Sequence, residues 1–214
     1  MNRGIPRPIP IYHFTHVKNL ESILRHGGLQ STSHLRERGI PYKDIAYRSV
    51  QRRRGTKPVP VAPGGVLHDY VPFYFAPKSP MMYTINRGNV EEYQDGQEPL
   101  IYLATTVETI QQAKLTYVFT DGHGIMQITG FYNDPEDLMR IDWPLMKSKY
   151  WGDTVEDPDR SRRRQAEFLI HKFVPWNVIS FIGTYSKRMT DYVRDLMKDT
   201  AGTPRVETRR QWYY

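Results

Sequence analysis

The 214-residue sequence contains no cysteine, and this absence excludes several kinds of chemistry. Without cysteine the chain forms no disulfide, has no thiolate nucleophile and offers no cysteine ligand to zinc. The first residues, Met1-Asn2-Arg3-Gly4-Ile5-Pro6-Arg7-Pro8, also lack the apolar stretch of a secretory signal. Both absences are typical of a cytoplasmic protein, which is what we expect.

Long apolar runs are absent as well. No stretch approaches the roughly 20 apolar residues of a membrane-spanning helix, and the mean hydropathy of −0.63 with 25% charged residues indicates a well-hydrated surface. Fifteen Tyr, eight Phe and four Trp supply bulky material for a core. We therefore expect one domain over residues 1–214 that binds no membrane.

Several common functional motifs are missing. The chain has neither a Gly-x-x-x-x-Gly-Lys phosphate loop nor a Gly-x-Gly-x-x-Gly segment, which argues against a P-loop NTPase and a dinucleotide-binding Rossmann domain. Its seven histidines show no paired ligand spacing, so we expect no metal site.

What the chain does have is positive charge in clusters. The formal net charge is +7 and the sequence pI is near 9.5. Arginine-rich clusters interleaved with aromatic residues suit phosphates and unstacked bases, so nucleic acid is the natural partner. A basic surface without a partner is the alternative. The clusters are Arg48, Arg52, Arg53, Arg54 and Lys57; Arg160, Arg162, Arg163 and Arg164; and Arg205, Arg209 and Arg210.

Strand and helix patterns are mixed without regular alternation, which favours an α+β fold. Residues 30–65 show little periodicity, which is typical of a functional loop or lid. Residues 152–164 read as a charged loop. The expected strands are 11–14, 71–76, 100–104, 117–120, 167–173 and 178–182, and the expected helices lie within 15–26, 45–54, 79–85, 105–113, 134–139, 143–150 and 187–198.

A basic run, Arg162-Arg163-Arg164, precedes a carboxylate that opens an apolar strand at Glu167. Because strand side chains alternate, Glu167 would share a face with Leu169 and would stand where the basic loop ends. Alone, this stretch also fits a solvated loop before an ordinary edge-strand acid.

Three further features are ambiguous on their own. Thr15 can cap a helix that ends at Gly27-Gly28, which would place His13 and Thr15 at a strand-to-helix corner where ligands often bind. Asp121-Gly122-His123-Gly124 fits a tight turn or a catalytic one. Tyr74 lies in an aromatic strand that would by itself be core.

Together these pieces resemble the ADP-ribosyltransferase fold of poly(ADP-ribose)-polymerase-like enzymes, a split β-sheet flanked by helices. Tyr12-His13-Phe14-Thr15, Phe73-Tyr74-Phe75-Ala76 and the strand opening at Glu167 match its His, Tyr, Glu order. Nearly the whole chain is similar to the DarT family, the toxins of DarT–DarG toxin–antitoxin pairs. The segments that carry this likeness are 45–54, 63–75, 119–124 and 165–169.

The resemblance implies an activity and its partners. Members of the DarT family transfer ADP-ribose from NAD to thymine bases in single-stranded DNA and release nicotinamide. We therefore expect a toxin that uses NAD as a substrate and no metal. We also expect a DarG-type macrodomain antitoxin as partner and a monomeric chain.

The resemblance also assigns roles. Glu167 would stabilise the positive, oxocarbenium-like ribose and remove a proton from the base, and Arg54, with Arg53 as the fallback, would polarise the base carbonyl. Residues 35–54 would cover NAD, and residues 123–165 would recognise the substrate. NAD would contact His13, Phe14, Thr15, Ser22, Gln30, Arg54 and Tyr74, and DNA would contact Arg53, His123, Arg162, Arg163 and Arg164.

The acceptor stays open at this point. Gln165-x-Glu167 also resembles the Gln/Glu-x-Glu motif of transferases that modify protein side chains. The alternatives are a guanine base, a protein side chain or an RNA end as acceptor, or a non-catalytic basic module that binds nucleic acid.

Overall fold

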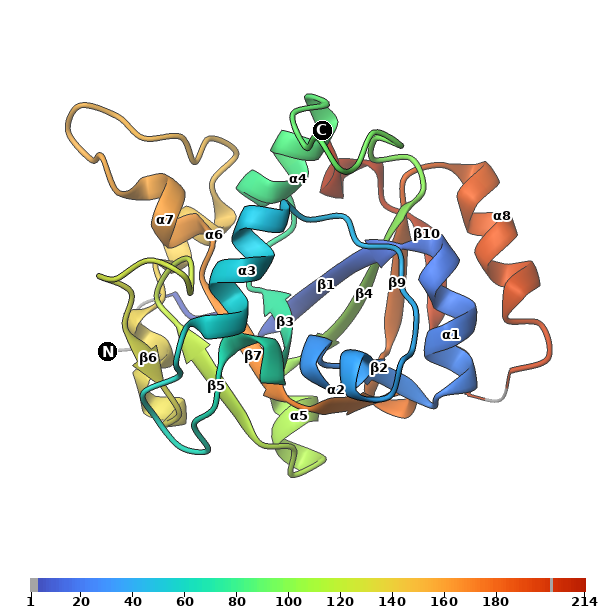
Figure 1. Cartoon of the computed structure of the whole chain (residues 1–214). Coiled ribbons are helices and arrows are strands. Elements are labelled where there is room, and N and C mark those ends of the chain that lie inside the picture. Colours follow the sequence, from blue (N-terminus) through green and yellow to red (C-terminus); the bar gives the residue numbers. More distant parts are fainter. Residues whose placement is uncertain (1–3, 201) are drawn as a thin grey trace.

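The fold is organised around a large β-sheet (Figure 1). The computed structural model describes residues 4–200 and 202–214, and residues 1–3 and 201 of the expected domain lie outside this description. Within the described residues the sheet has eight strands in the order β10-β9-β4-β1-β3-β7-β5-β6. The strands are β1 Pro10–His16, β3 Tyr70–Tyr74, β4 Leu100–Thr106, β5 Tyr117–Thr120, β6 Phe131–Tyr132, β7 Glu167–His171, β9 Phe181–Thr184 and β10 Arg205–Thr208.

The sheet is split between β1 and β3. β1 pairs with β4 along its whole length, and β3 pairs with β7 from Tyr70 to Tyr74. By contrast, β1 and β3 are paired only at Tyr12 and Tyr74, so the two halves diverge from this point. This geometry confirms the expected α+β fold with a split sheet, and it leaves room between the halves.

A small second sheet joins β2 (Gly28–Gln30) to β8 (Phe173–Pro175). Gly28 is required there because a Cβ atom at this position would lie 2.1 Å from the Val174 carbonyl oxygen. Gly27, with φ of +74°, follows the end of α1 as expected.

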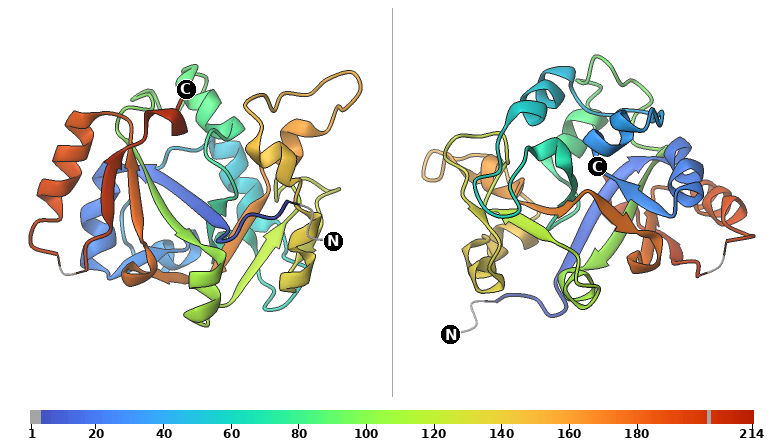
Figure 2. Two further views of the ribbon diagram at one scale, coloured as in Figure 1. Left: turned by 180° about the vertical axis from the view of Figure 1, so that it is seen from behind. Right: turned by 60° about the horizontal axis from the view of Figure 1, so that its bottom comes forward.

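Helices flank the sheet on both faces and at both ends. Figure 2 shows α8 at one end of the molecule and the yellow-to-orange segment containing β6, α6 and α7 at the other. The helices are α1 Leu20–Arg25, α2 Thr32–Glu37, α3 Arg48–Thr56, α4 Pro80–Asn86, α5 Val107–Gln112, α6 Trp143–Lys147, α7 Arg160–Arg164 and α8 Lys187–Leu196. Among the described residues, no helix has both the length and the apolar composition to cross a membrane.

β7 is a central strand, so the edge-strand interpretation of Glu167 is wrong. β7 lies between β3 and β5, and Glu167, Phe168, Leu169 and Ile170 are fully buried. The expected alternation of faces holds, because Phe168 and Ile170 pack into the largest apolar cluster while Leu169 packs into a separate one. A carboxylate is therefore held in the interior by the strand that carries it.

The predicted helix cap at Thr15 is wrong by one residue. Thr15 is the sixth residue of β1, and the side chain of His16 accepts the capping hydrogen bond from the Lys18 amide. At the end of β4, Thr106 is the last strand residue and caps α5. In both cases the strand continues further than its apolar residues indicate, because pairing between β1 and β4 includes the polar residues at its ends.

Two other boundaries differ from expectation. The predicted loop 152–164 ends in a helical turn, α7, because Asp159 and neighbouring acids pair with its arginines. The predicted strand 178–182 begins later, at Phe181, because residues 176–178 form a 3-10 turn.

Candidate active site between the halves of the sheet

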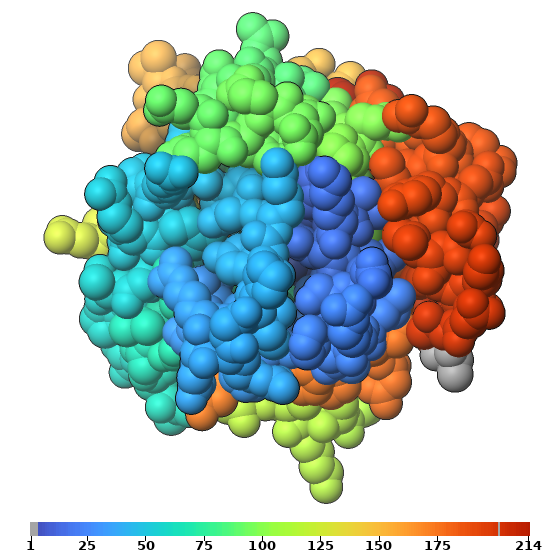
Figure 3. Space-filling view, turned by 45° about the vertical axis from the view of Figure 1, so that its right-hand side comes forward, coloured from blue at the N-terminus to red at the C-terminus, as the bar shows by residue number. Residues whose placement is uncertain are grey.

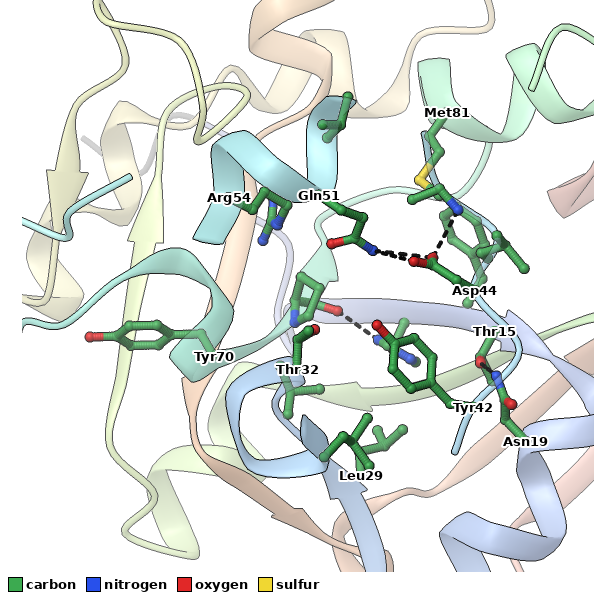
Figure 4. A pocket seen from close by; sticks show the side chains of 18 of the residues that line it. Thr15, Asn19, Leu29, Thr32, Tyr42, Asp44, Gln51, Arg54, Tyr70 and Met81 are labelled. Carbon is green, nitrogen blue, oxygen red and sulfur yellow. Dashed lines mark hydrogen bonds between the residues drawn. The ribbon is translucent and has the colours of Figure 1, made fainter. Parts of the chain in front are cut away.

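A cavity of about 480 Å³ lies where β1 and β3 diverge. In Figure 3 the blue and light-blue segments from the first quarter of the chain cross this face and leave a narrow opening between them. Figure 4 shows part of the lining at close range. The predicted site residues that line the cavity are His13, Phe14, Thr15, Ser22, Gln30, Arg54, Tyr74, His123 and Glu167; Arg53, Arg162, Arg163 and Arg164 do not line it.

Glu167 and Arg54 form a buried ion pair on the cavity wall. Arg54 Nη1 lies 3.1 Å from Glu167 Oε1 and 2.9 Å from Oε2. The side chain of Glu167 is 1% exposed and that of Arg54 is 12% exposed. A buried carboxylate is costly unless it is paired, so the position of α3, which carries Arg54, matters for the acid on β7.

The turn after β5 supplies the other contacts of Glu167. The Gly124 amide donates to Glu167 Oε1 at 3.0 Å, and the Glu167 amide donates to the Thr120 hydroxyl at 3.0 Å. That hydroxyl donates in turn to the Gly122 carbonyl at 2.7 Å. The segment Asp121-Gly122-His123-Gly124 is therefore a tight turn that is also part of the site.

His13 is held in a defined tautomer. Its Nδ1 lies 2.8 Å from the Pro72 carbonyl oxygen, which can only accept, so Nδ1 carries the proton. Burial lowers the pKa of His13, with the Pro72 bond opposing the shift, so the ring is neutral near pH 7. Nε2 is then an acceptor on the cavity wall, suited to a hydroxyl donor.

An aromatic wall lines the cavity beside the ion pair. The Phe14 and Tyr74 rings stack with centroids 5.9 Å apart and an interplanar angle of 20°. Burial, and then the charge of Glu167, raise the pKa of Tyr74, which stays a neutral phenol. Its hydroxyl is directed to Met81 Sδ at 3.9 Å.

Several buried polar atoms of the lining have no hydrogen-bond partner within the described part of the chain. They are Gln30 Oε1, Arg54 Nη2 and Glu167 Oε2. Oε2 is close to Arg54 Nη1 but lacks hydrogen-bond geometry. Buried polar groups are nearly always paired, so these three atoms indicate a polar ligand.

Comparison with known proteins identifies the family. The family model described as DarT, ssDNA thymidine ADP-ribosyltransferase, matches residues 12–214. The chain belongs to the DarT family. It is similar to a DNA ADP-ribosyl transferase of Thermus sp. strain 2.9, with 43% identity over 216 residues and 100% of both chains covered.

Solved structures agree with this family. The structure of Thermus sp. 2.9 DarT with ADP-ribosylated ssDNA superposes with a TM-score of 0.92, at 43% identity and with 100% of both chains covered. The same protein with NAD⁺ gives a TM-score of 0.88, at 41% identity, with 98% of this chain and 99% of that chain covered. Thermosipho africanus DarTG with ADP-ribose shares the fold, with a TM-score of 0.80 at 19% identity over 96% of this chain and 51% of that chain.

Membership of the DarT family confirms the expected activity. The chain is an NAD-dependent DNA ADP-ribosyltransferase, and its acceptor is thymidine in single-stranded DNA. The sequence alone left open other acceptors and a non-catalytic role. Family membership favours thymidine over these alternatives.

The residues that hold the segment over the cavity were not predicted from the sequence. Residues 38–47, called the strap here, follow α2 without regular structure and line the cavity with several side chains. Asn19 fixes the strap backbone, because its side chain donates to the Lys43 carbonyl at 3.0 Å and accepts from the Lys43 amide at 2.7 Å. No local pattern marks Asn19, since the strap is 24 residues away in the sequence.

A polar chain connects the strap to α2 and α3. Arg36 donates to His68 Nδ1 at 3.2 Å, so His68 Nε2 carries the proton and donates to Gln51 Oε1 at 3.0 Å. Gln51 Nε2 lies 3.1 and 3.2 Å from the two carboxylate oxygens of Asp44, as Figure 4 shows. Within the described residues, no cluster of three or more His, Asp or Glu side chains could hold a metal.

The arginines before Glu167 are engaged within the chain. Arg162 donates to Asp159 at 2.7 Å and to Asp121 at 3.1 Å. Arg163 pairs with Asp157 and Asp142. Their contacts give no support to the expected role in binding DNA, because paired guanidiniums are poorly available to phosphate.

Arg164 differs most from the expectation of a solvated basic loop. It is 4% exposed, and it donates to the carbonyl oxygens of Leu145, Met146 and Pro77 at 2.6 to 2.8 Å. Burial lowers its pKa. Arg164 is therefore a structural residue that joins α7 to α6 and to the turn before α4.

Arg53 and His123 are placed differently from one another. Arg53 is exposed on α3 and donates to the Ile125 carbonyl at 3.3 Å. His123 lines the cavity, where burial lowers its pKa while Glu167 opposes the shift. His123 thus faces the cavity near Glu167, and Arg53 faces solvent.

An aromatic and basic surface lies next to the cavity, and we call it the platform. It comprises Lys78, Tyr83, Lys149, Tyr150, Trp151 and Tyr214. α4 belongs to both sites, because Met81 and Thr84 line the cavity while Tyr83, 42% exposed, packs against Trp151 and Tyr214. Burial, followed by the nearby cations Arg210, Lys149 and Arg164, lowers the pKa of Lys78.

Proposed function

We propose that the cavity between β1 and β3 binds NAD, and that Glu167 and Arg54 transfer its ADP-ribose to thymine. The observation that carries this assignment is the buried carboxylate–guanidinium pair, whose Oε2 and Nη2 atoms have no hydrogen-bond partner within the described chain. Both atoms belong to residues that line the cavity.

The remaining lining residues suit the parts of NAD. The neutral His13 offers Nε2 as acceptor to a ribose hydroxyl, and Gln30 Oε1 offers a second buried acceptor. Ser22 and Thr15 contribute hydroxyls to the same wall. Because β1 leaves β3 after Tyr12, the edge of β1 near Phe14 has no partner in β3, and its backbone can bind the nicotinamide carboxamide.

Glu167 has two tasks in the proposed mechanism. When the bond between ribose and nicotinamide breaks, positive charge develops on the ribose carbon, and a buried carboxylate stabilises that charge strongly. A thymine nucleotide has one protonated ring nitrogen, N3, which must lose its proton to form the new bond. Glu167 accepts that proton, because within the described lining it is the carboxylate held in the interior.

Arg54 is the better candidate for the arginine of the reaction. Arg54 contacts Glu167 directly and lines the cavity. Arg53 lies on the exposed face of α3 and donates to the Ile125 carbonyl oxygen. A guanidinium beside the carboxylate can polarise a thymine carbonyl and balance the pyrophosphate charge. Tyr74 would pack against the nicotinamide half of NAD.

Residues 35–54 form the proposed cover of NAD. This range holds the strap and most of α3, and both line the cavity. Residues 123–165 form the proposed recognition segment. They run from the turn after β5, whose Gly124 amide contacts Glu167, to Gln165 on the cavity wall.

The DNA strand would reach Glu167 across the platform. Tyr83 and Tyr150 are 42% and 75% exposed, and Lys78 and Lys149 lie over neighbouring rings. Exposed aromatic rings among lysines bind single strands, because bases stack on the rings while phosphates contact the cations. His123 and Arg53 would contact the strand on the other side of the cavity.

The proposed partner is a DarG-type macrodomain antitoxin. Its support is family membership and the fold shared with Thermosipho africanus DarTG. A monomer in the cytoplasm is part of the same proposal.

An acceptor panel tests the proposal. The protein is incubated with NAD labelled on its adenylate phosphate and, separately, with thymine-containing single strands, matched strands without thymine, duplex DNA, RNA and protein. We expect label on the thymine-containing single strand and its loss in the Arg54→Ala variant. Equal labelling of the strand without thymine would overturn the assignment of the base, and full activity of Arg54→Ala would overturn the assignment of the site.

A further inference from the structure

The hydroxyl of Tyr214 connects two separate segments of the platform. Trp151 Nε1 donates to this hydroxyl at 2.6 Å, and the hydroxyl donates to the Lys78 carbonyl oxygen at 2.8 Å. One hydroxyl has a single proton and two lone pairs, so both bonds can exist together. The two partners lie 73 residues apart in the sequence and share no other hydrogen bond within the described chain.

The ring of Tyr214 completes the same arrangement. It packs edge-on against Tyr83 with centroids 5.2 Å apart, and the Lys78 ammonium lies 5.5 Å above its centre. Tyr83 also meets Trp151 at 5.9 Å. Tyr214 thus contacts three side chains of the platform: Tyr83 on α4, Lys78 in the turn before α4 and Trp151 in the segment before α7.

Neither partner of the hydroxyl lies in a helix or a strand. Lys78 has a φ of +55°, a left-handed backbone conformation that a residue with a Cβ rarely adopts without external contacts. Trp151 belongs to the irregular segment between α6 and α7, where no strand or helix fixes its direction. The hydroxyl bond restrains both.

Tyr214 itself is anchored without its hydroxyl. Its amide donates to Gln97 Oε1 at 3.0 Å. The preceding residue, Tyr213, is 1% exposed, and its hydroxyl lies 2.9 Å from both the Leu100 and the Gly183 carbonyl oxygens, which share its single proton. Removing the hydroxyl of Tyr214 should therefore leave the backbone and ring in place.

We propose that Tyr214 is a positioning residue for the DNA substrate: its hydroxyl fixes Trp151 and Lys78 as one surface that receives bases and phosphates of the single strand. This inference rests on the proposed DNA path across the platform. Tyr214 does not line the NAD cavity, so it acts on DNA through its two partners.

The test compares Tyr214→Phe, which removes only the hydroxyl, with Trp151→Phe, which keeps an aromatic ring but removes the indole donor. Steady-state transfer to a thymine-containing single strand gives KM for DNA, KM for NAD and kcat. We expect each variant to raise KM for DNA roughly threefold to tenfold, the effect of one lost hydrogen bond in Trp151→Phe and of two in Tyr214→Phe. KM for NAD should not change, and kcat at saturating DNA should stay within about twofold.

The double variant makes the test specific. Because both changes remove the same bond, the double variant should resemble the more affected single variant, and multiplied effects would overturn the proposal. An unchanged KM for DNA in Tyr214→Phe would overturn it too. Tyr192→Phe, which removes a hydroxyl from the half-exposed tyrosine of α8, serves as the matched control.

Tyr83→Ala separates this inference from the path on which it rests. If Tyr83→Ala raises KM for DNA and Tyr214→Phe does not, the path stands and the role of Tyr214 fails. If neither variant changes KM for DNA, the strand does not cross the platform and both fail. If both raise it, both are supported.

Discussion

At the scale of single residues, the site depends on how closely the turn after β5 approaches Glu167. A Cβ atom at Gly124 would lie 3.0 Å from Glu167 Oε1 and 3.3 Å from a methyl carbon of Leu67. Both neighbours are buried, so neither can move away freely. A glycine at this position lets a backbone amide reach the carboxylate.

Gly124→Ala should therefore lower kcat while the fold is kept. The added methyl group displaces the carboxylate by a fraction of an ångström, and a small misplacement at the reacting centre costs roughly tenfold to a hundredfold in rate. Transfer kinetics measure the effect. Gly152→Ala is the control, because nothing lies within 4 Å of a Cβ atom there; equal kinetics of the two variants would contradict the role of Gly124.

The sequence indicated the side chains of the cavity wall better than the residues that support them. His13, Tyr74 and Glu167 could be predicted because each belongs to a strand with a family-like pattern, and all three line the cavity. Arg164 could not be placed correctly, because its position in a basic run gives no sign that four backbone carbonyls surround it. Long-range partners of this kind leave no local pattern.

At the scale of elements, the strap and α3 are held together by one polar chain. Gln51 is its central member, since it accepts from His68 and donates to Asp44. α3 also carries Arg54 one turn later, on the side of the cavity. The strap could not be predicted in detail, because residues 38–47 have no periodicity and are fixed by side chains from other elements.

Gln51→Leu should weaken NAD binding more than it slows transfer. Leucine fills similar space but removes the bonds to the strap, so KM for NAD should rise roughly fivefold to tenfold with a smaller change in kcat. Steady-state kinetics at saturating DNA would measure both constants. Arg52→Leu, an exposed change on the same helix, should leave both constants unaltered. A KM for NAD unchanged in Gln51→Leu would show that this polar chain of side chains does not hold the strap over NAD.

At the scale of the whole molecule, histidines that are partly or fully buried connect stability to pH. Burial lowers the pKa of His13 and of His123. Burial, with Arg36 and then Arg54, lowers the pKa of His68 to about 4, while Asp44 and Asp69 oppose the shift. An unfolded histidine has a pKa of about 6.5.

The free energy of unfolding should fall as the pH falls from about 6.5 towards 4. In this window the unfolded chain takes up protons that the folded chain does not, so acid favours the unfolded state. Urea unfolding at pH 7 and pH 4.5 measures the loss, and His68→Gln, which cannot titrate, should reduce it by on the order of 1 kcal/mol after solvent screening. The same loss in both proteins would contradict a buried neutral His68.

The most direct test of the central claim is Glu167→Gln, which keeps the shape of the side chain but removes its charge and its basicity. Transfer of ADP-ribose from NAD to a thymine-containing single strand is measured together with the binding of NAD and of the strand. We predict that transfer falls by roughly a thousandfold or more while both affinities stay within about threefold. Transfer within tenfold of the parent enzyme would show that another group performs the reaction.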